Sequence, residues 1–158
     1  MPPPLLIDSD LFADRQDVFT HEQIYERMPH KHEFALLDGV VLADNEKGLA
    51  VAYHDCKTDG WWVRGHVPGR PIFPGVLQLE CSAQLIAFLT RYKDGCDKFI
   101  VFSGVEDCRF RDAVVPPCRL YFLARMIEDR TRRVKADVQG VVDGRIVFQA
   151  VVAGMQVA

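Results

Sequence analysis

The fold of this chain is decided by one stretch, Gly65-His66-Val67-Pro68-Gly69-Arg70-Pro71-Ile72-Phe73-Pro74-Gly75-Val76-Leu77-Gln78-Leu79-Glu80. Its prolines recur every third residue, at Pro68, Pro71 and Pro74, which matches the turn of a stiff polyproline II segment. A helix is predicted to follow, from Val76 to Thr90. Apolar residues cover most of its circumference, so the helix is expected to lie inside the protein.

Strands are predicted on both sides of this helix. Downstream they cover residues 99–110, 120–127, 134–142 and 146–157, with Asp143-Gly144 as a two-residue type I′ hairpin turn. Upstream they cover residues 34–40 and 48–53, separated by a turn at Asp44-Asn45. Consecutive strands joined by tight turns indicate antiparallel pairing, and a long apolar helix needs a concave sheet around it. The predicted class is therefore α+β, an antiparallel sheet wrapped around a central helix.

The length of 158 residues fits one domain, predicted over residues 19–158. Residues 1–18 are expected to form an acidic, poorly structured extension, because four aspartates accompany a single arginine there. At its end, Thr20 and Gln23 have the spacing of a capping box, and Phe19 is placed to contact Ile24 across the start of a short helix.

Composition excludes several classes of function. The acidic extension accounts for the whole net charge of −3, so the body is neutral and a nucleic-acid partner is not expected. Residues 109–135 carry a local excess of five positive charges, which suits either an acidic partner or an ordinary solvated strand face. Five irregularly spaced cysteines predict neither a disulfide framework nor a metal site, and indicate a reducing cytoplasm. No apolar run is long enough to predict a membrane span or a secretory signal.

Two residues of the central stretch are candidates for catalysis. Glu80 is the only charged residue of the predicted helix, and a carboxyl in such a place either finds a structural partner or serves as a proton donor. His66 is held between Gly65 and the proline segment; a lone histidine of this kind is either structural or a base. Backbone N–H groups at Gly75, at the start of the helix, are suited to stabilising a developing oxyanion.

These residues carry a resemblance to a known family. Residues 65–84, from Gly65-His66 to Ala83-Gln84, resemble the signature G-H-F-P-G-x-P-x-x-P-G-V-L-x-x-E-A-x-A-Q of the β-hydroxyacyl-acyl-carrier-protein dehydratases, FabZ/FabA type. Residues 28–38 and 110–116 are similar to that family's L-P-H-R-x-P-F-L-L-V-D and F-R-R-x-V-x-P. The likeness covers the chain from about Ile24 onward.

The resemblance implies a hot-dog fold and the dehydration of 3-hydroxyacyl chains presented on acyl carrier protein. His66 is then the base and Glu80 the acid, contributed by different subunits of a homodimer, and the N–H of Gly75 binds the thioester carbonyl. Glu80 in place of aspartate and Ala83 in place of tryptophan favour the branch that does not isomerise the double bond. A hexamer built as a trimer of dimers is left open, and no cofactor is implied.

The chain departs from the family pattern at a few positions, namely Val67, Glu33, Cys81 and Pro117-Cys118. None of these removes a catalytic group, although Val67 and Cys81 bear on chain-length preference. Gly75, Val76, Phe73 and Phe102 are the predicted substrate-binding residues. The aromatic candidates for lining an acyl tunnel or the dimer seam, which could instead be plain core, are Trp61, Trp62, Phe73, Phe99 and Phe102.

Two rival functions are kept beside dehydration: a hot-dog acyl-thioesterase, and a non-catalytic acyl-binding subunit. No metal is expected at the histidines near residue 30 or at His54-Asp55-Cys56, because the spaced partners of a zinc site are missing.

Overall fold

The computed structural model describes residues 3–157 and contains one antiparallel sheet of seven strands, in the order β1-β2-β3-β5-β6-β7-β4. The strands are β1 (Phe19–Thr20), β2 (Gly39–Asp44), β3 (Leu49–Cys56), β4 (Phe99–Phe110), β5 (Cys118–Asp129), β6 (Arg133–Val142) and β7 (Arg145–Val157). The helices are α1 (His21–Arg27) and α2 (Gly75–Thr90), with short 3-10 turns η1 (Ser9–Leu11), η2 (His32–Phe34) and η3 (Tyr92–Asp94). The predicted α+β class and the antiparallel sheet around a long helix are confirmed.

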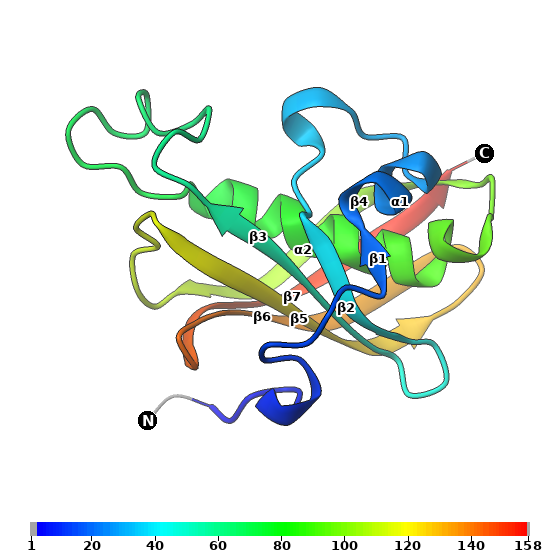
Figure 1. Ribbon diagram of the computed structural model, residues 1–158. Helices are drawn as coiled ribbons and strands as arrows, with labels where there is room; N and C mark the ends of the chain where they lie inside the picture. Colours follow the sequence, from blue (N-terminus) through cyan, green and yellow to red (C-terminus); the bar gives the residue numbers. More distant parts are fainter. Residues whose placement is uncertain (1–2, 158) are drawn as a thin grey trace.

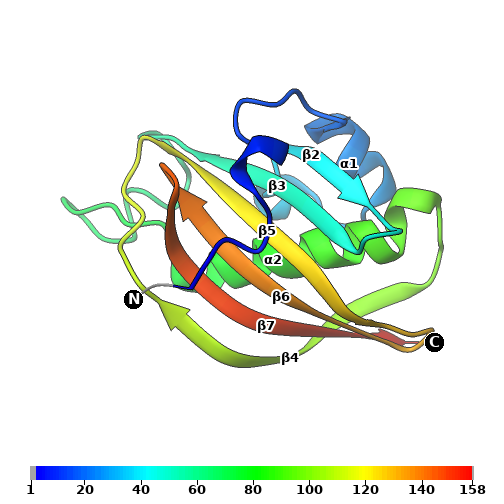
Figure 2. The same cartoon turned by 90° about the horizontal axis from the view of Figure 1, so that it is seen from below.

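The sheet curves around α2, which crosses its concave face (Figures 1 and 2). Alternate residues of β5 explain this packing: Leu120, Phe122 and Ala124 are fully buried against the helix side, whereas Leu123 belongs to a separate cluster on the opposite face. The period of two places one apolar set on each face of a strand. Along α2 itself Leu85, Phe88 and Leu89 are at most 1% exposed, so the helix lies inside the protein as predicted.

Local chemistry predicted several element ends correctly. Asp143 and Gly144 both have positive φ, of 49° and 75°, which is the backbone of the predicted type I′ turn between β6 and β7. Thr20 caps α1, with its side chain accepting from the N–H of Gln23 while the Gln23 side chain accepts from the N–H of Thr20. The capping box is therefore confirmed in both directions.

The proline-rich segment is not the continuous polyproline II strut that its spacing predicted. Val67 and Arg70 exchange backbone hydrogen bonds in both directions, of 3.3 and 2.9 Å, and Gly69 between them has a φ of 76°. This is a tight turn, whereas polyproline II has no internal hydrogen bonds. Only Pro71 to Pro74, directly before α2, lack turn structure.

The predicted strand at residues 34–40 is also wrong up to residue 38. Residues 32–34 form η2, and strand β2 begins only at Gly39. Leu36 and Leu37 are nevertheless buried, at 2% and 0% exposure. The segment is apolar because it packs over the core as a loop, and periodicity alone could not distinguish this from a buried strand.

The acidic extension is packed onto the sheet instead of being poorly structured. Ile7 and Phe12 are each 2% exposed and lie in the cluster on the convex face with Leu123. Gln139 on β6 binds the segment with both polar atoms, accepting from the N–H of Leu6 and donating to the carbonyl of Pro4. The segment contains apolar residues between its aspartates, and these bury one side of it against the sheet. This burial holds the segment in place despite its acidic composition.

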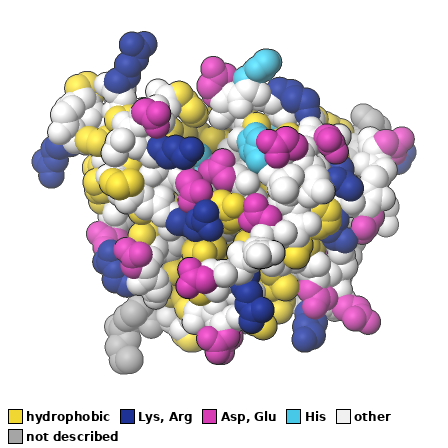
Figure 3. Space-filling view, in the orientation of Figure 1, with side chains coloured by type: hydrophobic (Ala, Val, Ile, Leu, Met, Phe, Trp, Pro, Cys, Tyr) yellow, Lys and Arg dark blue, Asp and Glu magenta, His cyan; other side chains and the backbone are white. Residues whose placement is uncertain are grey.

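No helix of the described residues is long and apolar enough to cross a membrane. On the face seen in Figure 3, acidic and basic side chains are intermingled with apolar ones, so this face carries no large patch of one sign. Most basic residues of the positive stretch form ion pairs, such as Arg119 with Asp55 and Arg125 with Asp137. The structure thus accounts for much of the local charge excess as paired strand faces.

Truncation of Phe12 tests whether the N-terminal segment contributes to the fold. Phe12 packs on Tyr121 with ring centroids 5.1 Å apart, so Phe12→Ala is expected to lower the free energy of unfolding by about 3 kcal/mol. The measurement is urea denaturation followed by circular dichroism. The matched control is Leu11→Ala, since Leu11 is 49% exposed and its loss should cost less than about 0.5 kcal/mol. Equal effects of the two changes would contradict a packed segment.

Candidate active site

The loop between β3 and α2 holds His66 in a defined tautomer. The Nδ1 atom of His66 lies 2.8 Å from the carbonyl oxygen of Ile72. A carbonyl can only accept, so Nδ1 carries a proton and donates it there, and in the neutral imidazole Nε2 is then the unprotonated nitrogen. Backbone hydrogen bonds from His66 to Trp62 and from Ile72 to His66, of 2.9 and 3.0 Å, fix the surrounding loop. The exposed side chain thus presents a bare nitrogen to solvent, as a base requires.

A first pocket joins His66 to the start of α2. Pro74 precedes the helix and supplies no side-chain cap, while its carbonyl accepts from the N–H groups of Leu77 and Gln78. The N–H groups of Gly75 and Val76 therefore find no partner in the described part of the chain. The lining of this pocket, called here the histidine pocket, comprises His66, Ile72, Phe73, Pro74, Gly75, Val76, Gln78, Phe110, Arg111, Asp112, Ala113 and Val114.

An aromatic ring lies close to the backbone of Gly75. A Cβ atom there would lie 2.9 Å from the ring of Phe110, so the ring or the helix start would have to shift. A backbone hydrogen bond also joins two segments that line the pocket, because the N–H of Phe73 donates to the carbonyl of Val114 at 2.8 Å. Gln78 is 3% exposed and its Oε1 has no hydrogen-bond partner in the described residues, which leaves one buried acceptor beside the pocket.

Glu80 lies one helical turn further along α2 and is held by Gln84. The Nε2 of Gln84 donates to Glu80 Oε1 at 3.0 Å and to the carbonyl of Phe34 at 2.9 Å, so both amide hydrogens are used. The Gln84 oxygen accepts from the hydroxyl of Tyr25 at 2.6 Å, and that hydroxyl accepts from the N–H of Leu37 at 2.8 Å. Burial raises the pKa of Tyr25, so its hydroxyl remains a donor. The chain of bonds therefore has one direction and ends on the carboxyl of Glu80.

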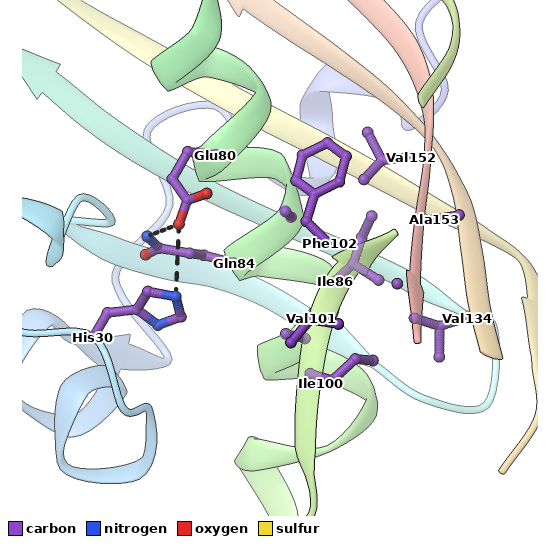
Figure 4. A pocket seen from close by; sticks show the side chains of 13 residues that line it. His30, Glu80, Gln84, Ile86, Ile100, Val101, Phe102, Val134, Val152 and Ala153 are labelled. Atoms are coloured by element: carbon purple, nitrogen blue, oxygen red, sulfur yellow. Dashed lines mark hydrogen bonds and ion pairs between the residues drawn. The ribbon is translucent and has the colours of Figure 1, made fainter. Parts of the chain in front are cut away.

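A second pocket contains Glu80, and Figure 4 shows its arrangement. Glu80, Gln84 and His30 point toward one another on one side, with His30 Nε2 3.6 Å from Glu80 Oε1. The other side is apolar and is formed by α2, the edge strand β4, β6 and β7. The lining of this carboxyl pocket comprises His30, Glu80, Ala83, Gln84, Ile86, Ala87, Ile100, Val101, Phe102, Val134, Val152, Ala153 and Gly154.

The two candidate catalytic residues do not meet within one chain. The histidine pocket contains His66 and the carboxyl pocket contains Glu80, and the two sets of lining residues have no member in common. Gly75, Val76 and Phe73 lie with His66, whereas Phe102 lies with Glu80. The expected base and the expected acid are thus both present, but they lie in two different pockets of the chain.

The other aromatic candidates differ in environment. Trp62 is 4% exposed and packs edge-on against Phe73 in the core, whereas Trp61 and Phe99 are about half exposed. Phe73 itself is 1% exposed and stacks on His54, so it is part of the core and also lines the histidine pocket. In the described part of the chain no group of three or more histidine, cysteine or acidic residues has the arrangement of a metal site.

Sequence reasoning missed three residues around Glu80. Gln84 could have been found, because it lies four residues after Glu80 and so shares its helix face. Tyr25 carries no such signal, since it reaches α2 from α1. His30 stands in the stretch 28–38 that resembles a family motif, but the motif does not show that its side chain reaches Glu80. Only the packing of α1 and the following loop over α2 brings the two residues to the carboxyl.

A sequence model of the FabA-like domain matches residues 28–151 of the chain. The chain belongs to the FabA-like family. This member is 34% identical to "3-hydroxyacyl-[acyl-carrier-protein] dehydratase FabZ" of Erythrobacter litoralis over 148 residues, covering 87% of this chain and 95% of that protein. It is 36% identical to the protein of the same name from Erwinia tasmaniensis over 134 residues, covering 82% of this chain and 87% of the relative.

Among solved structures, this FabA-like chain is similar to a chain of the dehydratase heterocomplex ApeI:P from Xenorhabdus doucetiae. The TM-score is 0.72 at 14% identity, and the match covers 85% of this chain and 91% of the other. At that identity the similarity shows the fold, and it confirms the hot-dog architecture expected from the sequence.

Removal of the Tyr25 hydroxyl tests the bond chain behind Glu80. Tyr25→Phe leaves the N–H of Leu37 and the oxygen of Gln84 without their partner in a buried place, so the free energy of unfolding should fall by about 1–3 kcal/mol. Gln84→Met removes the other end of the same bond.

A double-mutant cycle with urea denaturation measures the coupling between the two residues. The double variant should lose clearly less than the sum of the single losses, because each change already breaks the shared bond. Strict additivity would show that Tyr25 and Gln84 do not act together.

Proposed function

We propose that this protein removes water from 3-hydroxyacyl thioesters to form trans-2-enoyl thioesters, with His66 as the base and Glu80 as the acid. The observation that carries the proposal is the tautomer of His66: its proton is committed to the carbonyl of Ile72, and Nε2 is free to accept another. Membership of the FabA-like family and the identity to FabZ dehydratases support the same reaction.

The reaction divides between the two pockets. Nε2 of neutral His66 takes a proton from C2 of the substrate, and the charge that develops on the thioester oxygen is stabilised by the free N–H of Gly75 and the dipole of α2. Glu80, protonated, gives its proton to the C3 hydroxyl, which leaves as water while the C2–C3 double bond forms. The reverse hydration uses the same groups in the opposite order.

The separation of His66 from Glu80 within one chain supports a site shared by two subunits. Strand β4 is the edge of the sheet, and four of its apolar side chains are 41% to 50% exposed: Phe99, Phe102, Val105 and Phe110. A long, apolar edge strand is expected to pair with another chain. Phe102 lines the carboxyl pocket and Phe110 the histidine pocket, so antiparallel pairing of β4 with its copy would place Glu80 of one subunit near the partner subunit's His66.

Acyl carrier protein is the proposed donor of the acyl chain, as the names of the FabZ relatives state for those proteins. Arg111 lines the histidine pocket, and its guanidinium donates to Gln149 without forming an ion pair among the described residues. An acidic carrier could approach there. All five cysteines are free thiols, which supports the proposed location in a reducing cytoplasm.

The two rival functions, thioesterase and acyl-binding subunit, would use the unprotonated Nε2 of His66 differently from a dehydratase. A hot-dog thioesterase needs a group that directs water at the thioester carbonyl, and an acyl-binding subunit needs no base at all. The bare Nε2 of His66, close to the N–H that binds the carbonyl oxygen, instead suits proton removal from the carbon next to that carbonyl. This geometry favours dehydration.

Replacement of each candidate catalytic residue tests the proposed roles. His66→Ala and Glu80→Gln should each lower the hydration rate of a crotonyl thioester by about 100-fold or more, because each removes one proton transfer. The loss of enoyl absorbance measures the reaction, and a thiol reagent in parallel detects thioesterase activity. Native rates in either variant would refute the role assigned to that residue, and thiol release without hydration would favour the thioesterase.

Mixed dimers test whether the site is shared. Each of the two variants is inactive alone, but a dimer with one subunit of each contains one site with both His66 and Glu80 intact. Co-expressed in equal amounts, the two variants should recover roughly a quarter of native activity, because half of the dimers are mixed and each has one good site of two. If both residues acted within one chain, the mixture would stay as inactive as its components.

A further inference from the structure

We infer that His30 is a positioning residue for the acid: its imidazole N–H stabilises the carboxylate of Glu80 as the proton leaves for the substrate. This inference rests on the proposed function and adds a residue to it. Both His30 and Gln84 approach the same oxygen, Oε1 of Glu80, at 3.6 and 3.0 Å. The second oxygen of Glu80 is turned toward the apolar wall of the pocket (Figure 4), where a substrate would lie.

The surroundings of the imidazole select its tautomer. Nδ1 of His30 is buried and has no hydrogen-bond partner among the described residues. A proton on Nδ1 would therefore be an unsatisfied buried donor, which is costlier than an unsatisfied lone pair. The proton belongs on Nε2, and this nitrogen faces Glu80.

The imidazole is also held neutral. Burial lowers the pKa of His30, and the nearby Glu80 carboxylate opposes this only in part. A neutral donor is suited to an acid that must keep its proton until the hydroxyl leaves, since a permanent cation would ionise Glu80 too early. His30 would instead strengthen its contact as negative charge develops, from 3.6 Å in the free protein to hydrogen-bond distance in the reacting complex.

The loop that carries His30 is fixed on both sides. Lys31 donates to the carbonyl oxygens of Tyr25 and Met28, at 2.5 and 3.0 Å, at the end of α1. Gln84 donates to the carbonyl of Phe34 on the other side. His30 is thus attached to the same network that orients Gln84, so both donors reach Glu80 from a common frame.

Other titratable groups near the carboxyl are accounted for. Tyr25 comes from α1, Lys31 and Asp38 come from the loop after it, and Cys81 follows on α2. Burial raises the pKa of Tyr25 and of Cys81, so neither ionises in the range of an activity assay. Strand β4 contributes only apolar side chains to this pocket. In the proposed dimer the remaining group is the partner subunit's His66.

Two substitutions separate the donor from the bulk of the ring. His30→Leu keeps volume but has no donor, and should lower kcat by about 10- to 100-fold with KM changed less than about threefold. His30→Gln retains an N–H donor and should recover most of the rate.

The matched control is His32→Asn, two residues further on. His32 is exposed and has a φ of 55°, a backbone that asparagine tolerates, so its replacement should leave kcat and the pH profile unchanged. Long-range 1H–15N spectra of the native protein add a readout independent of turnover, and should show the His30 proton on Nε2.

The possible failures are distinguishable. Native kcat in His30→Leu would overturn the inference alone, as would equal losses in the Leu and Gln variants, which indicate a role in folding only. A proton on Nδ1 of His30 would overturn it as well. A native chain that hydrates no crotonyl thioester would overturn the proposed function and this inference with it.

Discussion

The structure depends on burying α2 inside the curve of a single sheet. Most residues of this helix are buried, so its polar groups need partners. Ser82 donates to the carbonyl of Gln78, and Gln84 is satisfied by three neighbours. Two polar groups remain: the buried Oε1 of Gln78, which has no partner among the described residues, and Glu80, which has one oxygen held and the other turned toward a pocket. The enclosure of the helix therefore turns one carboxyl into a candidate proton donor.

The start of the same helix lies beside the other half of the proposed site. Its free N–H groups at Gly75 and Val76 open toward the histidine pocket, and His66 is held there by the loop before the helix. Because α2 is a continuous helix, it fixes the distance between the N–H groups at its start and the carboxyl of Glu80 in each chain. The two pockets are separate within one chain, which makes the exposed apolar edge of β4 part of the functional argument as well as of the fold.

Two segments outside the sheet stabilise its two faces in different ways. The N-terminal segment covers the convex face with Ile7 and Phe12, away from the candidate site. Helix α1 and the loop at residues 28–38 cover α2 and bring Tyr25, His30 and the carbonyl of Phe34 to the residues around Glu80. The N-terminal segment contributes burial and two hydrogen bonds with Gln139, whereas α1 and the loop contribute hydrogen-bonding groups around the carboxyl.

The sequence by itself determined the central helix, the antiparallel strands from residue 99 onward, the capping box at Thr20 and the hairpin turn at Asp143-Gly144, because each follows from local period or turn chemistry. It also singled out His66, Gly75 and Glu80. Only the tertiary structure decided that the proline segment closes a turn at Val67 and Arg70, that the acidic segment is packed, and that Tyr25, His30 and Gln84 converge on Glu80. The packing of the acidic segment and the approach of Tyr25 and His30 depend on contacts between residues distant along the chain, which local patterns do not show. The turn at Val67 and Arg70 and the contact of Gln84 with Glu80 are local, so their spacing alone could have indicated them.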